Sequence, residues 1–128
     1  MRIAEVAEKY EISADTLRYY ERAGLLPHVH RTEAGVRDYD EADCARIEFV
    51  KCMRGANVSV EALAKYMRLM DRGDETLEAR KAILVEQRAA ARARLAELQA
   101  GLERLDYKIA HYDDLIAEAE HRLRRDPA

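Results

Sequence analysis

The stretch TLRYYERAGLLP, residues 16–27, decides how the first part of the chain folds. Ser13 stands just before it and carries the kind of side chain that caps helix N-termini. Gly24 and Pro27 follow the charged run, and both residue types are typical of the end of a helix. The sequence therefore predicts a short helix from about Ala14 to Ala23.

The two adjacent tyrosines of this helix face different ways, because neighbouring helical side chains point about 100° apart. Leu17 and Tyr20 share a face that continues into Leu25, which indicates a side packed against a core. Arg18 and Tyr19 fall on the polar side. Arginine donates a fork of N–H groups to phosphates or guanine, and a phenol donates one hydrogen bond. We expect Tyr20 to anchor the helix and Tyr19 to meet a partner.

A second short helix precedes this one, because apolar residues recur at helical spacing in the first ten positions. Two short helices joined by about three residues form a helix-turn-helix arrangement. The residues that carry this pattern are Ile3, Val6, Ala7 and Tyr10.

The segment after Pro27 predicts a small β-hairpin, or wing. Turn-forming residues 33–35 separate two short extended runs. Arg31 and Arg37 lie on the two arms, and alternation places Tyr39 on the same side as Arg37. Together with Arg18 and Arg22 of the helix, these arginines place cations on two connected elements, as a protein that binds a DNA groove requires.

Two more helices follow the wing. Asp40 predicts the start of a third helix, which we expect to end at Gly55. Ser59 predicts the start of a fourth, which Gly73 ends. The order helix, helix, wing, helix, helix describes a mainly α, winged helix-turn-helix domain over residues 1–73.

Residues 74–128 have a different character, with apolar side chains stepping by threes and fours over many turns. A helix that has left its own core cannot bury such a stripe, so a second copy of the chain is the expected partner. We therefore predict a long dimerisation helix, a C-terminal tail and a homodimer. The stripe comprises Leu84, Leu95, Leu98, Leu102, Leu105, Ile109, Tyr112 and Ile116.

Composition sets further limits. The chain of 128 residues carries a formal net charge of −3, and both predicted parts hold a slight excess of acids. Binding to DNA therefore requires basic residues gathered on one face.

The sequence contains no run of 18 apolar residues and no signal peptide, so we expect a cytoplasmic protein without a membrane partner. Its two cysteines cannot form a disulfide framework.

With these residues in place, the chain resembles the MerR family of bacterial transcription regulators. The resemblance is carried by IAEVAEKYEISADTLRYYERAGLLP, by RTEAGVRDYDEAD and by the long heptad helix. It implies a dimer with an antiparallel coiled coil and two winged heads. Such dimers bind a palindromic promoter element, twist the overlong spacer DNA, and so act on RNA polymerase indirectly. Shape readout then matters as much as base readout.

The resemblance also implies roles for particular residues. Thr16, Arg18 and Tyr19 match contacts of the recognition helix, and Arg37 and Tyr39 match the wing arginine and tyrosine. Val36 departs from the family, which usually has an aromatic residue before the wing arginine.

The sequence leaves two interpretations open for Cys52. Lys51 and Arg54 flank it, and cations favour the reactive thiolate. Its position resembles the lone cysteine of the aldehyde- and nitrosative-stress subgroup of the family, which implies a sensing thiol. The alternative is a small buried core residue. Cys44 is interpreted as core, since about 12 Å along the helix separates the two thiols.

Other classes of function find less support. The sequence has no phosphate-binding loop, no HExxH motif and no obvious nucleophile with a paired base, so we predict no catalysis. No cofactor is expected, and the four histidines show no metal-ligand spacing, although zinc on Cys52 and a histidine remains an alternative. Two further alternatives are a regulator that responds to a small molecule without using a thiol, and a coiled-coil DNA-binding or adaptor protein that does not regulate.

Overall fold

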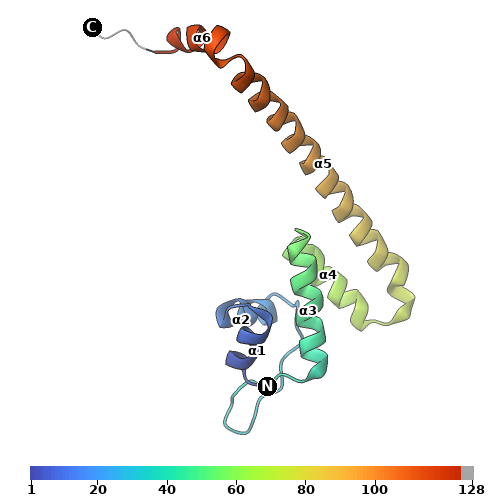
Figure 1. The fold of residues 1–128 in the computed structure, drawn as a ribbon. Helices are drawn as coiled ribbons and strands as arrows, with labels where there is room; N and C mark the ends of the chain where they lie inside the picture. Colours follow the sequence, from blue (N-terminus) through green and yellow to red (C-terminus); the bar gives the residue numbers. More distant parts are fainter. Residues whose placement is uncertain (125–128) are drawn as a thin grey trace. The chain divides into compact units, whose positions relative to one another are not determined.

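The computed structural model describes residues 1–124, with the side chains of 115 and 116 left out. The described chain is mainly α-helical (Figure 1). Its contacts divide it into a first compact unit, Met1–Arg88, and a second that begins at Ala89. We call the first unit the head.

The head opens with the predicted helix-turn-helix. Helix α1 spans Ile3–Tyr10 and α2 spans Ala14–Arg22. The Ser13 hydroxyl accepts a hydrogen bond from the backbone N–H of Thr16 at 3.1 Å, as expected for the N-cap. Gly24 has φ +85°, a left-handed conformation that favours glycine, and it follows Ala23, the C-cap residue of α2.

Helices α3 (Glu41–Gly55) and α4 (Val60–Asp71) complete the head's helical core. Asp40 caps α3 reciprocally: its carboxylate accepts from the Asp43 N–H at 2.8 Å, and the Asp43 carboxylate accepts from the Asp40 N–H at 3.0 Å. The Ser59 hydroxyl caps α4 by accepting from the Ala62 N–H at 3.1 Å. All three N-caps predicted from the sequence are therefore present.

The core of the head consists of two clusters, and side chains of α2 and α3 contribute to both. Tyr20 packs against each cluster, which ties them together. The first cluster contains Val6, Tyr10, Leu17, Leu26, Val29, Tyr39 and Ile47; the second contains Leu25, Val50, Val58, Leu63, Ala64 and Met67.

The predicted β-hairpin is reduced to a turn with a single antiparallel bridge between Arg31 and Arg37, and the residues that the structure describes form no strand. Two backbone hydrogen bonds flank the bridge, from Thr32 N–H to Val36 O at 2.8 Å and from Asp38 N–H to His30 O at 2.7 Å. We call residues 30–38 the bridged turn. Two arms this short provide one rung of pairing, too little for a regular ladder.

The long helix α5 spans Leu77–Ala110, after a short 3₁₀ turn at Asp74–Thr76. Its first turns belong to the head, because Ile83 is buried and Gln87 Oε1 accepts from the Ser59 N–H at 3.1 Å. The head therefore extends to Arg88, whereas the sequence predicts a domain boundary after residue 73.

The later turns of α5 expose their apolar stripe. The exposed fractions of the stripe residues from Leu95 to Ile109 lie between 53% and 73%. Leu84 differs, because it is half-buried within the head. The stripe comprises Leu95, Leu98, Leu102, Leu105 and Ile109.

The helix ends earlier than the heptad pattern predicts. After Ala110 the backbone changes to a π-helical turn at Tyr112–Ile116, followed by the short helix α6 at Ala117–His121. Tyr112 is exposed but lies beyond α5, which corrects the prediction of one continuous helix through residue 116. The Ile116 side chain, also predicted at the dimer interface, lies outside the described part. Among the described helices, none is long and apolar enough to cross a membrane.

Candidate nucleic-acid interface

The N-terminal turn of α2 presents a compact polar group. The Ser13 hydroxyl donates to Thr16 Oγ1 at 2.8 Å while accepting from the Thr16 backbone. Arg18 Nη1 donates to Asp15 Oδ1 at 2.9 Å, and the Asp15 side chain is almost fully exposed. An exposed ion pair of this kind contributes little to stability. The Arg18 guanidinium is therefore free to exchange its carboxylate partner for a phosphate.

The outer face of α2 continues with Tyr19 and Arg22. Tyr19 is 41% exposed, whereas Tyr20 is half-buried between the two core clusters. Arg22 is exposed in the last turn of the helix. The helix thus has the two faces that the sequence predicts, with one tyrosine inward and one outward.

The bridged turn brings two more arginines near its base. Arg31 Nη1 donates to the Gly35 carbonyl at 3.0 Å, across the turn. Gly35 has φ +80°, and its N–H donates to Thr32 O at 2.8 Å. Gly35 lets the chain reverse within this short loop, because a residue with a side chain would be strained there. Val36, at the position where the family usually has an aromatic residue, is exposed at 44%.

Arg37 is linked to α2 by an ion pair. Its Nε donates to Glu21 Oε1 at 3.2 Å, and the two side chains are 20% and 11% exposed. The bond joins residues that lie 16 positions apart in the chain. The bridged turn and α2 are therefore directly connected through this pair.

Tyr39 does not lie with these residues on the surface. Its ring is 2% exposed in the first core cluster, so the structure corrects its predicted role as a surface contact. Its hydroxyl is buried, and the described residues offer it no hydrogen-bond partner. Burial raises the pKa of this phenol above its usual value. Tyr39 therefore belongs to the core of the head and not to its surface.

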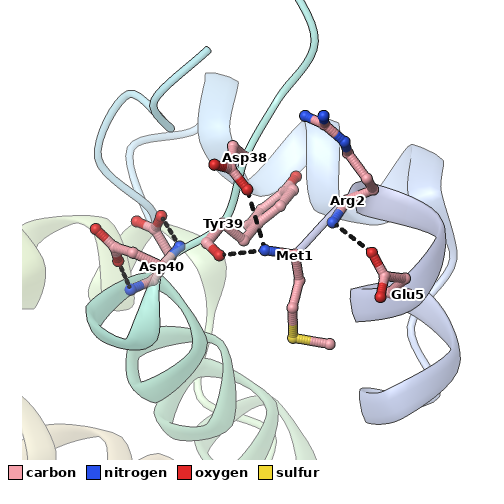
Figure 2. A network of polar contacts seen from close by, with 7 residues as sticks. Met1, Arg2, Glu5, Asp38, Tyr39 and Asp40 are labelled. Carbon is pink, nitrogen blue, oxygen red and sulfur yellow. Dashed lines mark hydrogen bonds and ion pairs between the residues drawn. The ribbon is translucent and has the colours of Figure 1, made fainter. Parts of the chain in front are cut away.

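The chain's first residue fastens the exit of the bridged turn (Figure 2). The Met1 ammonium donates to Asp38 Oδ1 at 3.1 Å and to the Tyr39 carbonyl at 2.7 Å. This contact lowers the pKa of Asp38, because a hydrogen bond and a positive charge both favour the carboxylate. At the start of α1, the Glu5 carboxylate accepts from the Arg2 N–H at 3.0 Å.

The two cysteines occupy different environments. Cys52 is exposed near the end of α3, which disfavours its interpretation as a buried core residue. Cys44 is half-buried against the first core cluster, as predicted. The cations beside Cys52 each bind a carbonyl: Lys51 Nζ donates to Tyr10 O at 2.5 Å, and Arg54 Nη1 donates to Val58 O at 2.7 Å.

Sequence reasoning missed Glu21, Met1 and the carbonyl contact of Lys51. Each acts over a long separation in the chain, and no local pattern signals such a pairing. Within the described residues, no group of three or more histidine, cysteine or acidic side chains is placed to hold a metal ion.

Comparison with known proteins agrees with this geometry. Residues 1–70 match the family described as MerR HTH family regulatory protein. The HTH-type transcriptional regulator AdhR of Bacillus subtilis (strain 168) is 56% identical over 88 residues, which cover 69% of this chain and 63% of that protein. The chain thus matches less than two thirds of that relative's length.

Two solved structures extend the likeness along the chain. A MerR family transcriptional regulator from Listeria monocytogenes is 45% identical, with a TM-score of 0.77 over 96% of this chain and 93% of that one. HiNmlR, a MerR family regulator lacking the sensor domain and bound to promoter DNA, is 34% identical, with a TM-score of 0.69 over 91% and 92%. These relatives are regulators and not enzymes, and the chain belongs to the MerR family of helix-turn-helix transcriptional regulators.

Proposed function

We propose that the protein binds double-stranded promoter DNA through the outer face of α2 and the bridged turn. The observation that carries this proposal is the ion pair between Arg37 and Glu21, which joins the bridged turn to α2. These two elements together carry four arginines, although the whole chain is slightly acidic. The DNA-bound structure of HiNmlR, with a similar fold, supports it. The proposed contacts are Thr16, Arg18, Tyr19, Arg22, Arg31 and Arg37.

The proposed DNA-binding form is a homodimer. The apolar stripe of α5 is exposed in a single chain, and a second chain packed on it would bury these side chains. Each large side chain removed from water contributes roughly 1.5–3 kcal/mol to the stability of the dimer. Charge favours an antiparallel pair: residues 77–94 carry five basic and two acidic side chains, whereas residues 95–121 carry two basic and seven acidic ones. Antiparallel packing sets the basic residues 77–94 of one chain against the acidic residues 95–121 of the other.

Two heads related by a twofold axis would read a palindromic element. By resemblance to the family, the dimer distorts the spacer between the promoter elements, so that RNA polymerase responds to the shape of the DNA. Selection of duplexes from a random-sequence pool by the purified protein tests this proposal. We expect the selected duplexes to share an inverted repeat, and footprinting to show hypersensitive positions at its centre. Selected duplexes without an inverted repeat would contradict the proposal.

We further propose that Cys52 responds to electrophiles such as aldehydes. Its exposure on α3 allows attack, and its position resembles that of the sensing cysteine in one subgroup of the family. The thiolate sulfur forms a bond to the carbonyl carbon, the π electrons move to oxygen, and water supplies the proton that completes the hemithioacetal.

In vitro transcription from the selected promoter tests the sensing role. We expect formaldehyde to change transcription with the wild-type protein and with Cys44→Ser, the matched thiol control. Cys52→Ser should bind the promoter without responding. A full response from Cys52→Ser would remove this residue from the mechanism and favour an effector that needs no thiol.

A further inference from the structure

An acidic side chain lies within the basic surface proposed to meet DNA. Glu21 follows Tyr19 and Tyr20 on α2, and its side chain is only 11% exposed. By charge alone, a carboxylate at this place repels phosphates and weakens binding. The contact that Glu21 makes gives it a different role.

The contact engages only one edge of its partner. The guanidinium of Arg37 has five N–H donors in a fixed plane, one on Nε and four on the two Nη atoms. Glu21 accepts from Nε at 3.2 Å, and within the described residues the Arg37 side chain makes this one hydrogen bond. The guanidinium is thereby held at Nε, while its Nη atoms make no hydrogen bond with the described residues and remain available for a phosphate oxygen.

The other polar side-chain contacts of the bridged turn do not join it to α2. Arg31 binds Gly35 within the turn itself. The Met1 ammonium binds Asp38 and the Tyr39 carbonyl, at the point where the chain leaves the turn. Among the hydrogen bonds of the described residues, the Glu21 contact is the one that joins a side chain of α2 to a side chain of the turn.

We propose that Glu21 is a positioning residue for DNA binding, which holds Arg37 by Nε so that its Nη edge meets a phosphate in register with α2. This inference rests on the proposed function, because it requires that Arg37 contact DNA. The carboxylate strengthens binding indirectly: a pre-oriented arginine loses less conformational freedom on binding than a free one.

The test compares two ways of removing one negative charge from the head. Glu21→Gln removes the charge and the ion pair, and Glu33→Gln, on the exposed turn, removes a charge for which the described residues show no ion pair. Affinity for the selected duplex is measured by fluorescence anisotropy over a range of salt concentrations. We expect Glu21→Gln to bind about tenfold more weakly and Glu33→Gln to bind as tightly as the wild type or more tightly.

The salt dependence identifies the contact that is lost. Arg37→Ala should lower the slope of log K against log salt by about one, as expected for one lost phosphate contact. Glu21→Gln should lower it similarly. In the Arg37→Ala background, Glu21→Gln should cause no further loss, because a residue that acts through Arg37 has nothing left to position.

The outcomes separate this inference from the proposed function. If the wild type binds no duplex, the proposed function fails. If Arg37→Ala weakens binding but Glu21→Gln leaves it unchanged or tightens it, the positioning role is contradicted. If the two losses add in the double variant, and thermal melting shows that Glu21→Gln lowers stability to the same extent with or without Arg37, Glu21 serves folding and the inference is likewise overturned.

Discussion

Tyr19 and Tyr20 are adjacent in the chain, yet their rings are tilted by 57° with centroids 6.2 Å apart, and they lie on different sides of α2. Tyr20 packs against both core clusters, and Tyr19 is 41% exposed. One helix therefore anchors itself in the head and presents an aromatic side chain to a partner, which is why it carries both residues.

This division of roles predicts that alanine at Tyr20 affects mainly stability, whereas alanine at Tyr19 affects mainly DNA binding. Tyr20→Ala should lower the free energy of unfolding by about 3 kcal/mol, because it leaves a cavity where the two clusters meet. Tyr19→Ala should change that free energy by less than about 0.5 kcal/mol and weaken binding to the selected duplex. Urea denaturation and anisotropy measure the two quantities. A large loss of stability in Tyr19→Ala would contradict the assignment.

Arg18→Ala should weaken binding to the selected duplex and lower its salt slope by about one, because a phosphate contact is lost. The Asp15–Arg18 pair is exposed, so little stability should be lost with it. Arg68→Ala, on the exposed side of α4, is the matched control and should leave the slope unchanged. An unaltered slope in Arg18→Ala would remove this arginine from the interface.

Tyr39→Phe should raise the free energy of unfolding by about 1 kcal/mol, because it removes a buried hydroxyl that has no partner. DNA affinity should stay unchanged. The pKa of Tyr39 is raised in the folded state, so ionisation of this phenol opposes folding: the protein keeps its stability below pH 10 and loses part of it as the pH rises through the folded pKa. Urea titrations at pH 8 and pH 11 should show a smaller alkaline loss in Tyr39→Phe, and an equal loss would contradict this account.

Acid should weaken the ion pair between the Met1 ammonium and the Asp38 carboxylate. Its pKa is lowered in the folded state, so the stability that it contributes is present above its unfolded pKa of about 3.9 and lost as the pH falls through the folded pKa. Asp38→Asn should therefore reduce the loss in the free energy of unfolding as the pH falls below about 4. Acetylation of the Met1 amine should have the same effect. Asp113→Asn, an exposed change on the second unit, is the control and should leave this loss unchanged.

Leu98→Glu should shift the protein from dimer towards monomer, because it places a charge in the apolar stripe. Ala100→Glu adds the same charge two positions on, about 200° around the helix, and should leave the mass unchanged. Sedimentation at micromolar concentration distinguishes the two variants. A Leu98→Glu protein that kept the wild-type mass would place the dimer contact elsewhere.

Local signals carried much of this fold. Ser13, Asp40 and Ser59 cap helices where the sequence predicts caps, since a capping bond involves residues only three positions apart. Gly24 behaves as predicted for the same reason: its φ of +85° is a property of the local backbone.

The remaining features depend on contacts that a one-dimensional pattern does not contain. Alternation placed Arg37 and Tyr39 on one side of the chain, but it does not state which of them the core covers. The partnership of Glu21 with Arg37 crosses 16 positions. The heptad pattern runs past Ala110, although the backbone leaves the α-helix there.

Helix α3 sends Ile47 into the first core cluster and Val50, three positions later, into the second. The hydrophobic interior of the head is therefore continuous along a single rod, although its side chains group in two places. Local unfolding of either core cluster would remove the packing contacts of α3 along half of the helix. The head should consequently unfold as one cooperative step, with equal calorimetric and van't Hoff enthalpies.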